Sequence, residues 1–256
     1  MTAVLVAINV GVWLWMILHG VPAGSPTGNQ MIGWGGNVAP LTLTGDGWRL
    51  VTSMFLHFGI VHLALNMYVL AFTGPRAEQE FGSWRMLLIY LAGGLLSSCA
   101  SAFWSSLHTI AVDPFGRQSV HLVVGAGASG AVMALFGGLL AAALLGTPGH
   151  DGNPRGPKID KPLIQVIVIN LAMGFFIQGV DQAAHVGGFL GGLAIGAILG
   201  VRGGRGVVGS RLLVAALLVA ACLWALFHGA RRPEFDDVRQ QLQQERAARP
   251  QGGGDV

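Results

Sequence analysis

The chain has 256 residues, of which 52% are hydrophobic and only 11% are charged. Ordinary soluble domains carry roughly 25% charged residues, so this composition indicates a polytopic membrane protein with the lipid bilayer as its surroundings. The net charge of +3, carried by dispersed arginines, argues against nucleic acid as a partner, and the two cysteines, Cys99 and Cys222, lie in apolar segments and predict no disulfide framework.

Seven stretches are apolar over about the 20 residues that a helix needs to cross a bilayer. They are residues 2–19, 53–72, 85–105, 122–146, 162–180, 182–201 and 212–229. The stretch HGVPAGSP after the first one weakly resembles a signal-peptide cleavage site, but no basic region precedes it, so a first membrane helix is the favoured interpretation. The fifth and sixth stretches follow each other so closely that we expect a tight hairpin.

These stretches predict an all-α membrane protein with a six-helix bundle and one additional C-terminal helix. The expected parts are a first helix (1–20), an outer-leaflet loop (21–52), core helices (53–201), an extra helix (212–229) and a polar tail (230–256). Trp34 and Trp48 in the loop suit a membrane interface. The tail is rich in Gln and Arg and ends in Gly, so we expect it to be solvated and partly disordered.

Basic residues orient the chain, because they collect in cytoplasmic loops. The loops after the second, fourth and sixth spans hold most of them: Arg76, Arg85, Arg155, Lys158, Lys161, Arg202, Arg205 and Arg211. The N-terminus is therefore predicted to be cytoplasmic, in the plasma (inner) membrane if the protein is bacterial. The tail carries five arginines and would lie outside, so either the seventh span is forced across by the six before it or it does not cross.

Few strongly polar groups lie inside the predicted spans, where such groups are costly and usually functional. The second span contains His57, His62 and Asn66, the fourth contains Ser129 and the sixth contains His185. At 1.5 Å per residue, Ser129 is expected about 10 Å, His185 about 5 Å and His62 about 14 Å from the outer ends of their helices. All three helices run inward, so the polar groups are predicted to share one outer-leaflet layer.

This combination suits acyl transfer. A serine becomes nucleophilic when a histidine takes its proton, and an amide, an imidazole N–H and a backbone N–H can stabilise the oxyanion. Gly127, Ala128 and Gly130 beside Ser129 are expected to leave space for a substrate backbone. Taken singly, each residue also fits a structural role: serine in small-residue packing, histidine in a hydrogen-bonded core, asparagine as interhelical glue.

Glycines at 188, 192, 196 and 200 repeat along one face of the sixth span. We interpret this face as a close-packing surface that presses the sixth span against the fourth and brings His185 near Ser129.

The sequence lacks the residues that a zinc metalloprotease or an aspartyl protease would need within the membrane. No HExxH motif is present, and no metal or cofactor is predicted. Asp181 is the only acidic residue at the edge of a span, so a carboxylate dyad is excluded. Asp181 either caps the sixth helix, which is the favoured interpretation, or orients His185 as a third triad member.

At these residues the sequence resembles the rhomboid intramembrane serine proteases over roughly residues 37–200. The matching motifs are Trp48-Arg49, the spacing His57-x4-His62-x3-Asn66, Gly127-Ala128-Ser129-Gly130, and Ala184-His185-Val186-Gly187-Gly188. The resemblance implies a Ser129–His185 dyad, an oxyanion hole from His62, Asn66 and the Ser129 N–H, and substrates that are single transmembrane helices. Met133 is a departure, since some members carry tyrosine there.

The sequence thus predicts a multi-pass serine endopeptidase that cleaves near the outer face. The alternative is a catalytically silent relative that binds membrane helices, which would be marked by loss of Ser or His, and neither is lost. A small transporter would require polar groups at the bilayer midplane and broken helices in paired halves, and the sequence has neither.

Overall fold

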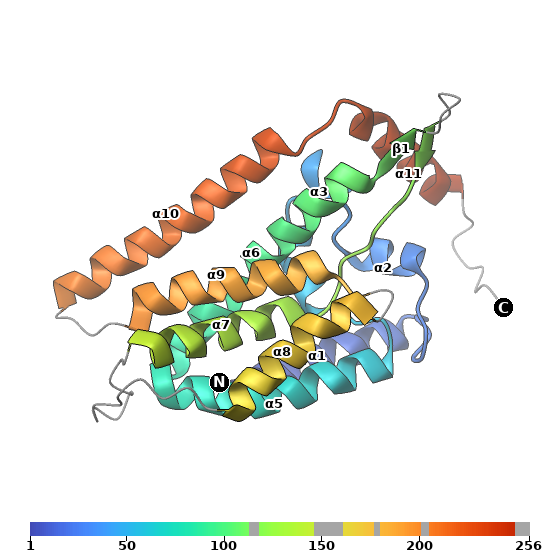
Figure 1. Cartoon of the computed structure of the whole chain (residues 1–256). Helices are drawn as coiled ribbons and strands as arrows, with labels where there is room; N and C mark the ends of the chain where they lie inside the picture. The colour runs from blue at the N-terminus through green and yellow to red at the C-terminus, as the bar shows by residue number, and fades with distance from the viewer. Residues whose placement is uncertain (113–117, 146–160, 177–179, 201–204, 249–256) are drawn as a thin grey trace.

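Helices make up nearly all of the regular structure in the computed structural model, which describes residues 1–112, 118–145, 161–176, 180–200 and 205–248 (Figure 1). The longer helices are α1 (Thr2–Leu18), α5 (Ile60–Phe81), α6 (Ser83–His108), α7 (Ser129–Leu145), α8 (Lys161–Phe176), α9 (Gln182–Gly200), α10 (Arg205–Gly229) and α11 (Glu234–Ala248). The short ones are α2 (Gly28–Trp34), α3 (Ala39–Leu43), α4 (Arg49–Thr52) and the 3-10 turn η1 (Ser53–Phe55). The prediction of an all-α membrane fold is confirmed, with one small antiparallel hairpin of β1 (Ile110–Val112) and β2 (Gln118–Val120) added to it.

The helices of an integral membrane protein are evident from length and composition. Within the described residues, α6, α9 (over Gln182–Leu199) and α10 (over Gly209–Gly229) are long and apolar enough to cross a bilayer. A fourth span is possible if the pair Arg49–Phe55 and Ile60–Phe81, bent by 89°, counts as one. The helices α1, α7 and α8 are apolar but shorter, so the number of seven spans stays a prediction.

The centre of the molecule is the contact between α7 and α9. Glycines every fourth residue on α9 lie directly on the backbone of α7, so that a Cβ on any of them would overlap it: Gly188 meets Gly130, Gly192 meets Ala134 and Gly196 meets Gly138. The constant offset shows that the two helices run parallel and in register. Small residues permit this close approach, so the predicted role of the glycine face is confirmed for these three positions. Gly200 ends α9.

Two of the predicted spans begin later than the sequence suggested. The span expected at 53–72 is broken before Ile60, where α5 begins and continues to Phe81. The span expected at 122–146 has no helix before Ser129, and the residues leading to it instead pair with the loop through Asn37 and Gly125. The depths predicted for His62 and Ser129 within their helices were therefore wrong. His62 is the third residue of α5 and Ser129 is the first of α7.

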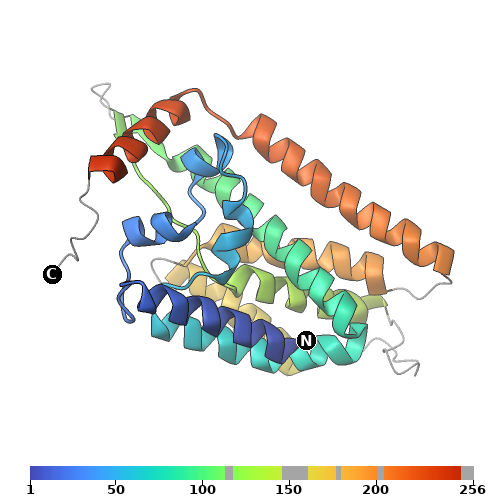
Figure 2. The same ribbon diagram turned by 180° about the vertical axis from the view of Figure 1, so that it is seen from behind.

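The predicted outer loop is an ordered layer at one end of the molecule. α2, α3, the β1–β2 hairpin and α11 gather at this end in both views (Figures 1 and 2). The helix α2 begins with a capping box, in which Thr27 and Gln30 satisfy each other's backbone N–H groups. The expectation of a partly disordered tail was wrong for residues 234–248, which form the helix α11 and bury Phe235 completely and Val238 to 6% exposure.

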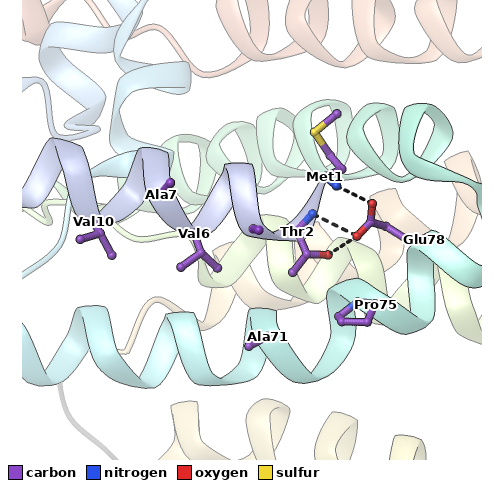
Figure 3. Close-up of a pocket in the computed structure, with 9 residues that line it drawn as sticks. Met1, Thr2, Val6, Ala7, Val10, Ala71, Pro75 and Glu78 are labelled. Carbon is purple, nitrogen blue, oxygen red and sulfur yellow. Dashed lines mark hydrogen bonds and ion pairs between the residues drawn. The ribbon is translucent and has the colours of Figure 1, made fainter.

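A separate groove of about 670 Å³ lies between α1 and α5 (Figure 3). Its walls are mainly apolar, and at one end Thr2 Oγ1 donates a hydrogen bond of 2.7 Å to Glu78 Oε2. Glu78 follows His62 by sixteen residues on the same helix, about 24 Å along its axis. This groove is therefore remote from Ser129.

Candidate active site

Ser129 stands at the start of α7, immediately after a backbone turn that requires glycine. Gly127 has φ +133°, and a Cβ there would lie 2.8 Å from Cε1 of His62, 3.0 Å from its Nε2 and 3.8 Å from Ser129 Oγ. Any larger residue would be strained and would displace the imidazole. Ser129 Oγ and His62 Nε2 thus both lie within 4 Å of the Cβ position of residue 127. Ser129 itself is partly exposed.

The helix start also supplies backbone donors. The first four N–H groups of an α-helix have no partner within the helix, and the N–H of Ser129 is among them in α7. The helix dipole adds partial positive charge at the same place, which favours an anion. An oxyanion beside Ser129 would therefore meet both a donor and a favourable field.

The tautomer of His62 follows from its hydrogen bond. The backbone N–H of Phe58 donates to Nδ1 of His62 at 3.2 Å, so Nδ1 is an acceptor and the proton of the neutral ring is on Nε2. Cε1 and Nε2 form the edge of the ring that lies beside Gly127, so the N–H of the ring is at this edge, next to the turn that precedes Ser129.

Asn66 lies one turn further along α5 and is 6% exposed. Its Nδ2 donates to the backbone carbonyl of His62 at 2.8 Å. An amide nitrogen carries two hydrogens, so one remains for another acceptor. The bond to the preceding turn orients the amide on the same helix as His62.

His57 is buried beside the site and binds the backbone of the residue before Ser129. Its ring is fully buried and its Nε2 accepts the backbone N–H of Ala128 at 3.4 Å. The N–H of Gly127 donates to the carbonyl of Ser53 at 2.9 Å. His57 and Ser53 thus hold the two residues before Ser129 from the side of the broken second span.

His185 is the fourth residue of α9, as the predicted distance of about 5 Å from the helix start requires. It is 7% exposed, and its Nδ1 lies 3.4 Å from the backbone carbonyl of Asn170 on α8. Next to it, the carbonyl of Ala184 lies 3.5 Å from where a Cβ of Gly130 would be. The residues adjoining His185 and Ser129 are therefore packed together, although among the described residues no hydrogen bond joins the two side chains.

Asp181 caps α9. Its Oδ1 accepts the backbone N–H of Ala184 at 2.9 Å, and its Oδ2 accepts from the hydroxyl of Ser101 on α6. An acidic N-cap bonded to the third helical N–H is the expected capping geometry. The prediction of a cap is confirmed, and both carboxylate oxygens have partners other than the imidazole of His185.

Serines of α6 complete the site, and the sequence analysis missed them. Ser97 Oγ donates to the carbonyl of Ala184 at 2.8 Å and also fills the space beside Gly130, so three helices meet at this hydroxyl. Ser101 holds the cap in the same way one turn later. The signal was the four-residue spacing of Ser97 and Ser101, which places both on one face of the helix.

The distance of the site from the end of the bundle follows from its position along α6. α6 runs antiparallel to α9, since Ser101 meets Asp181 while Leu96 meets Gly191. From Ser101 the helix continues to His108, about 10 Å further toward the end that holds the hairpin. The start of α9 lies beside Ser101 and thus about 10 Å from the end of α6. The start of α7 lies farther from that end, because Gly130 meets Ser97, eleven residues or about 16 Å before His108.

The structure places the three residues that were predicted to line a substrate cavity in different surroundings. Ala128 is fully buried in the main apolar core, and the free side of Gly130 is filled by Ser97. The Cβ position of Gly127 lies 3.8 Å from Ser129 Oγ. Met133 is also in the core, at 1% exposure. Among the described residues, no group of three His, Cys, Asp or Glu side chains could hold a metal ion.

Comparison with known proteins is consistent with this geometry. The family model of the Rhomboid domain matches residues 44–202. Rhomboid protease GluP of Bacillus subtilis is 33% identical over 236 residues, which cover 92% of this chain and 42% of that protein. Rhomboid protease AarA of Providencia stuartii is 34% identical over 78% of this chain and 71% of its own length.

RHOMBOID-like protein 2 of Arabidopsis thaliana is 40% identical over 65% of this chain and 46% of its length. The chain thus spans less than half of the Bacillus and Arabidopsis proteins and most of the Providencia one. The match of the family model covers Ser129, His185, His62 and Asn66 alike. The chain belongs to the rhomboid family.

Proposed function

We propose that the protein is an intramembrane serine endopeptidase with Ser129 as nucleophile and His185 as base. The observation that carries the proposal is the proximity of two side chains at the start of α7. Ser129 Oγ and the Nε2–H of His62 both lie next to the Cβ position of residue 127. The parallel packing of α9 on α7 holds the segment before His185 against Gly130. Two relatives named as rhomboid proteases support the same activity.

The chemistry proceeds by acyl transfer. His185 Nε2 takes the proton of Ser129 Oγ as the oxygen attacks the peptide carbonyl carbon, and the carbonyl electron pair becomes an oxyanion. His185 returns that proton to the leaving nitrogen, and water then hydrolyses the acyl ester with His185 again as base. A proton on Nδ1 that faces the carbonyl of Asn170 leaves Nε2 free for this role.

The oxyanion is stabilised by three donors in this proposal: the N–H of Ser129, Nε2–H of His62 and the second amide hydrogen of Asn66. The tautomer of His62 and the position of Ser129 at a helix start supply the first two. Donors held in place before the charge develops cost no reorganisation during the reaction.

The proposed substrates are transmembrane segments of single-span membrane proteins. A helix in lipid keeps its backbone groups paired, so a substrate must unwind locally before Ser129 can reach a carbonyl carbon. The helix starts that carry His185 and Ser129 lie about 10 Å and about 16 Å from the end of α6, and we place cleavage in the outer part of the substrate's span. The N-terminus is then cytoplasmic, and the site opens to the outer face.

Labelling with a serine-directed fluorophosphonate in detergent tests the proposal. Covalent label is expected on Ser129, absent in Ser129→Ala and strongly reduced in His185→Ala. Ser106→Ala is the matched control, because Ser106 is a buried serine on α6 that donates to the carbonyl of Phe103, away from the site. Equal labelling of the wild type and Ser129→Ala would leave the alternative, a silent protein that binds membrane helices.

The oxyanion donors have a separate test. Removal of one such donor costs about 10²–10³ in kcat in a soluble serine protease; with the charge shared by three donors, Asn66→Ala and His62→Ala are each expected to lower the cleavage rate by about tenfold or more. Asn9→Ala is the control for Asn66, because Asn9 makes the same bond to the preceding turn, 2.8 Å to Leu5 O, on α1. If Asn66→Ala unfolds the protein but keeps full turnover, Asn66 is interhelical glue.

A further inference from the structure

The C-terminal helix α11 is fastened to the outer layer by both apolar and charged contacts. Phe235 packs in a cluster with Leu43 and Leu50 of the loop and Leu226 of α10. Leu242, two turns later, packs in a second cluster with Leu122 and Val124, which belong to the segment that leads to Ser129, and with Ile32, Val38 and Leu41. The tail therefore packs on the same loop residues as the segment before the nucleophile.

Arg239 is the polar centre of this contact. Its Nη1 donates to the carbonyl of Leu41 at 3.2 Å and to Thr44 Oγ1 at 3.1 Å, and its Nη2 donates to Asp46 Oδ1 at 2.7 Å. A planar guanidinium makes these contacts from two nitrogens held in a fixed fork, whereas an ammonium group has a single nitrogen. Arg239 thus closes the end of α3 against α11.

Asp46 also binds Arg49. Its other oxygen, Oδ2, accepts from Arg49 Nε at 3.0 Å. Burial raises the pKa of Asp46, but the hydrogen bonds with Arg239 and Arg49 outweigh this effect and hold the pKa below its ordinary value of 3.8. The carboxylate is therefore charged at neutral pH and bridges two arginines.

Arg49 connects this bridge to the backbone beside the site. It is 2% exposed, and its Nη1 donates to the carbonyls of Ile32 at 2.7 Å and Gly36 at 3.1 Å. The next residue, Asn37, exchanges two backbone hydrogen bonds of 2.8 Å with Gly125. Gly125 lies four residues before Ser129, so a continuous series of contacts joins α11 to the nucleophile.

We propose that α11 is a clasp that positions the segment 122–128 and through it Ser129, with Arg239 as a positioning residue. The effect on Ser129 rests on the proposed function, whereas the ordering of 122–128 does not. The proposal also places α11 on the face where the site opens, so that α10 crosses from the opposite side and returns the chain to the outer loop (Figure 2). The tail then completes the active-site end of the molecule.

Two measurements on the full chain in detergent test the clasp. The first is amide hydrogen exchange of peptides that cover 122–128, where the N–H groups of Gly125, Gly127 and Ala128 are bonded. Arg239→Ala is expected to speed this exchange by about three- to tenfold, within the range typical of coupling through packed networks. Arg239→Lys keeps the charge but loses the planar fork, and its effect is expected to be smaller.

The second measurement is the rate of fluorophosphonate labelling of Ser129, expected to fall about three- to tenfold in Arg239→Ala. Arg231→Ala is the matched control for both, because Arg231 pairs with Asp236 within the tail at 3.1 Å and both side chains are exposed. Unchanged exchange of 122–128 in Arg239→Ala, or an equal change in Arg231→Ala, would overturn the clasp. Absence of label in the wild type would overturn the proposed function alone, since the exchange experiment does not depend on it.

Discussion

The helices α9 and α10 are alike in sequence character and differ greatly in their surroundings. Both are long and apolar enough to cross a membrane, and α10 is the more apolar of the two. Nevertheless 39% of the α9 span is buried inside the protein, against 11% of the α10 span. Figure 1 shows α9 beside α7, whereas α10 runs along the edge of the molecule.

Burial of a helix in this membrane bundle therefore follows the size of its side chains more than their apolarity. Lipid chains are as apolar as leucine, so helices associate where small residues let their backbones approach. α9 has such residues at Gly188, Gly192 and Gly196, each against the α7 backbone. α10 exposes large side chains, including Leu213, Leu217 and Trp224, and packs on the rest of the protein along one side, from Leu218 to Phe227.

The largest expected effect compares one histidine from each helix. His185 on α9 is buried beside the start of α7, whereas His228 on α10 is exposed and its Nδ1 lies 2.9 Å from the carbonyl of Trp224. We expect His185→Ala to lower the cleavage rate of a model substrate by about 10²–10⁴-fold, the usual contribution of a general base. His228→Ala is expected to leave the rate unchanged, and an equal loss in both variants would contradict the assignment of the base to α9.

The second effect compares one glycine from each helix. A Cβ on Gly192 would overlap the backbone of Ala134, whereas a Cβ on Gly209 of α10 would meet nothing within 4 Å. We expect Gly192→Ala to force the helices apart and to cost about 1–3 kcal/mol of stability, measured by thermal unfolding in detergent. Gly209→Ala should instead be neutral or stabilising by up to about 1 kcal/mol, because alanine favours a helix. Equal melting temperatures of the two variants would show that α7 and α9 are not packed this tightly.

The smallest effect concerns the start of α9, which Asp181 caps by accepting the backbone N–H of Ala184. Asp181→Asn keeps a good N-cap, so we expect less than about 1 kcal/mol of stability to be lost and little change in cleavage rate. A loss of orders of magnitude in rate with the fold intact would mean that the carboxylate acts on His185 as a triad member. The rate and the melting temperature of the same preparation separate the two outcomes.

The sequence predicted the membrane class and the family, but it misjudged where two of the helices begin. Residues 122–128 are apolar, and a rule based on length and hydropathy counts them as helical. In the structure Gly125 pairs with Asn37, 88 residues away, and Gly127 takes a φ of +133° that ends any helix. A scale that scores residues one by one does not register a backbone pairing between distant segments.

Local spacing determined other features of the protein. The four-residue separation of His62 and Asn66 placed them on one helix face, and the four-residue glycine period marked the face of α9 that meets α7. Such patterns are read directly from the chain, because helix geometry repeats within a few residues whatever the rest of the fold does.

The tertiary structure alone decided where the tail lies. By composition, residues 234–248 are polar and suit a solvated end. Their position depends on the ion pair of Arg239 with Asp46, 193 residues apart, and on the burial of Phe235 against Leu226 and the loop. Neither contact has a local sequence signal, since an arginine on a polar helix has the same propensity whether water or a distant carboxylate is its partner. Only when the loop and the end of α10 are brought to the same end of the bundle does that carboxylate come within reach.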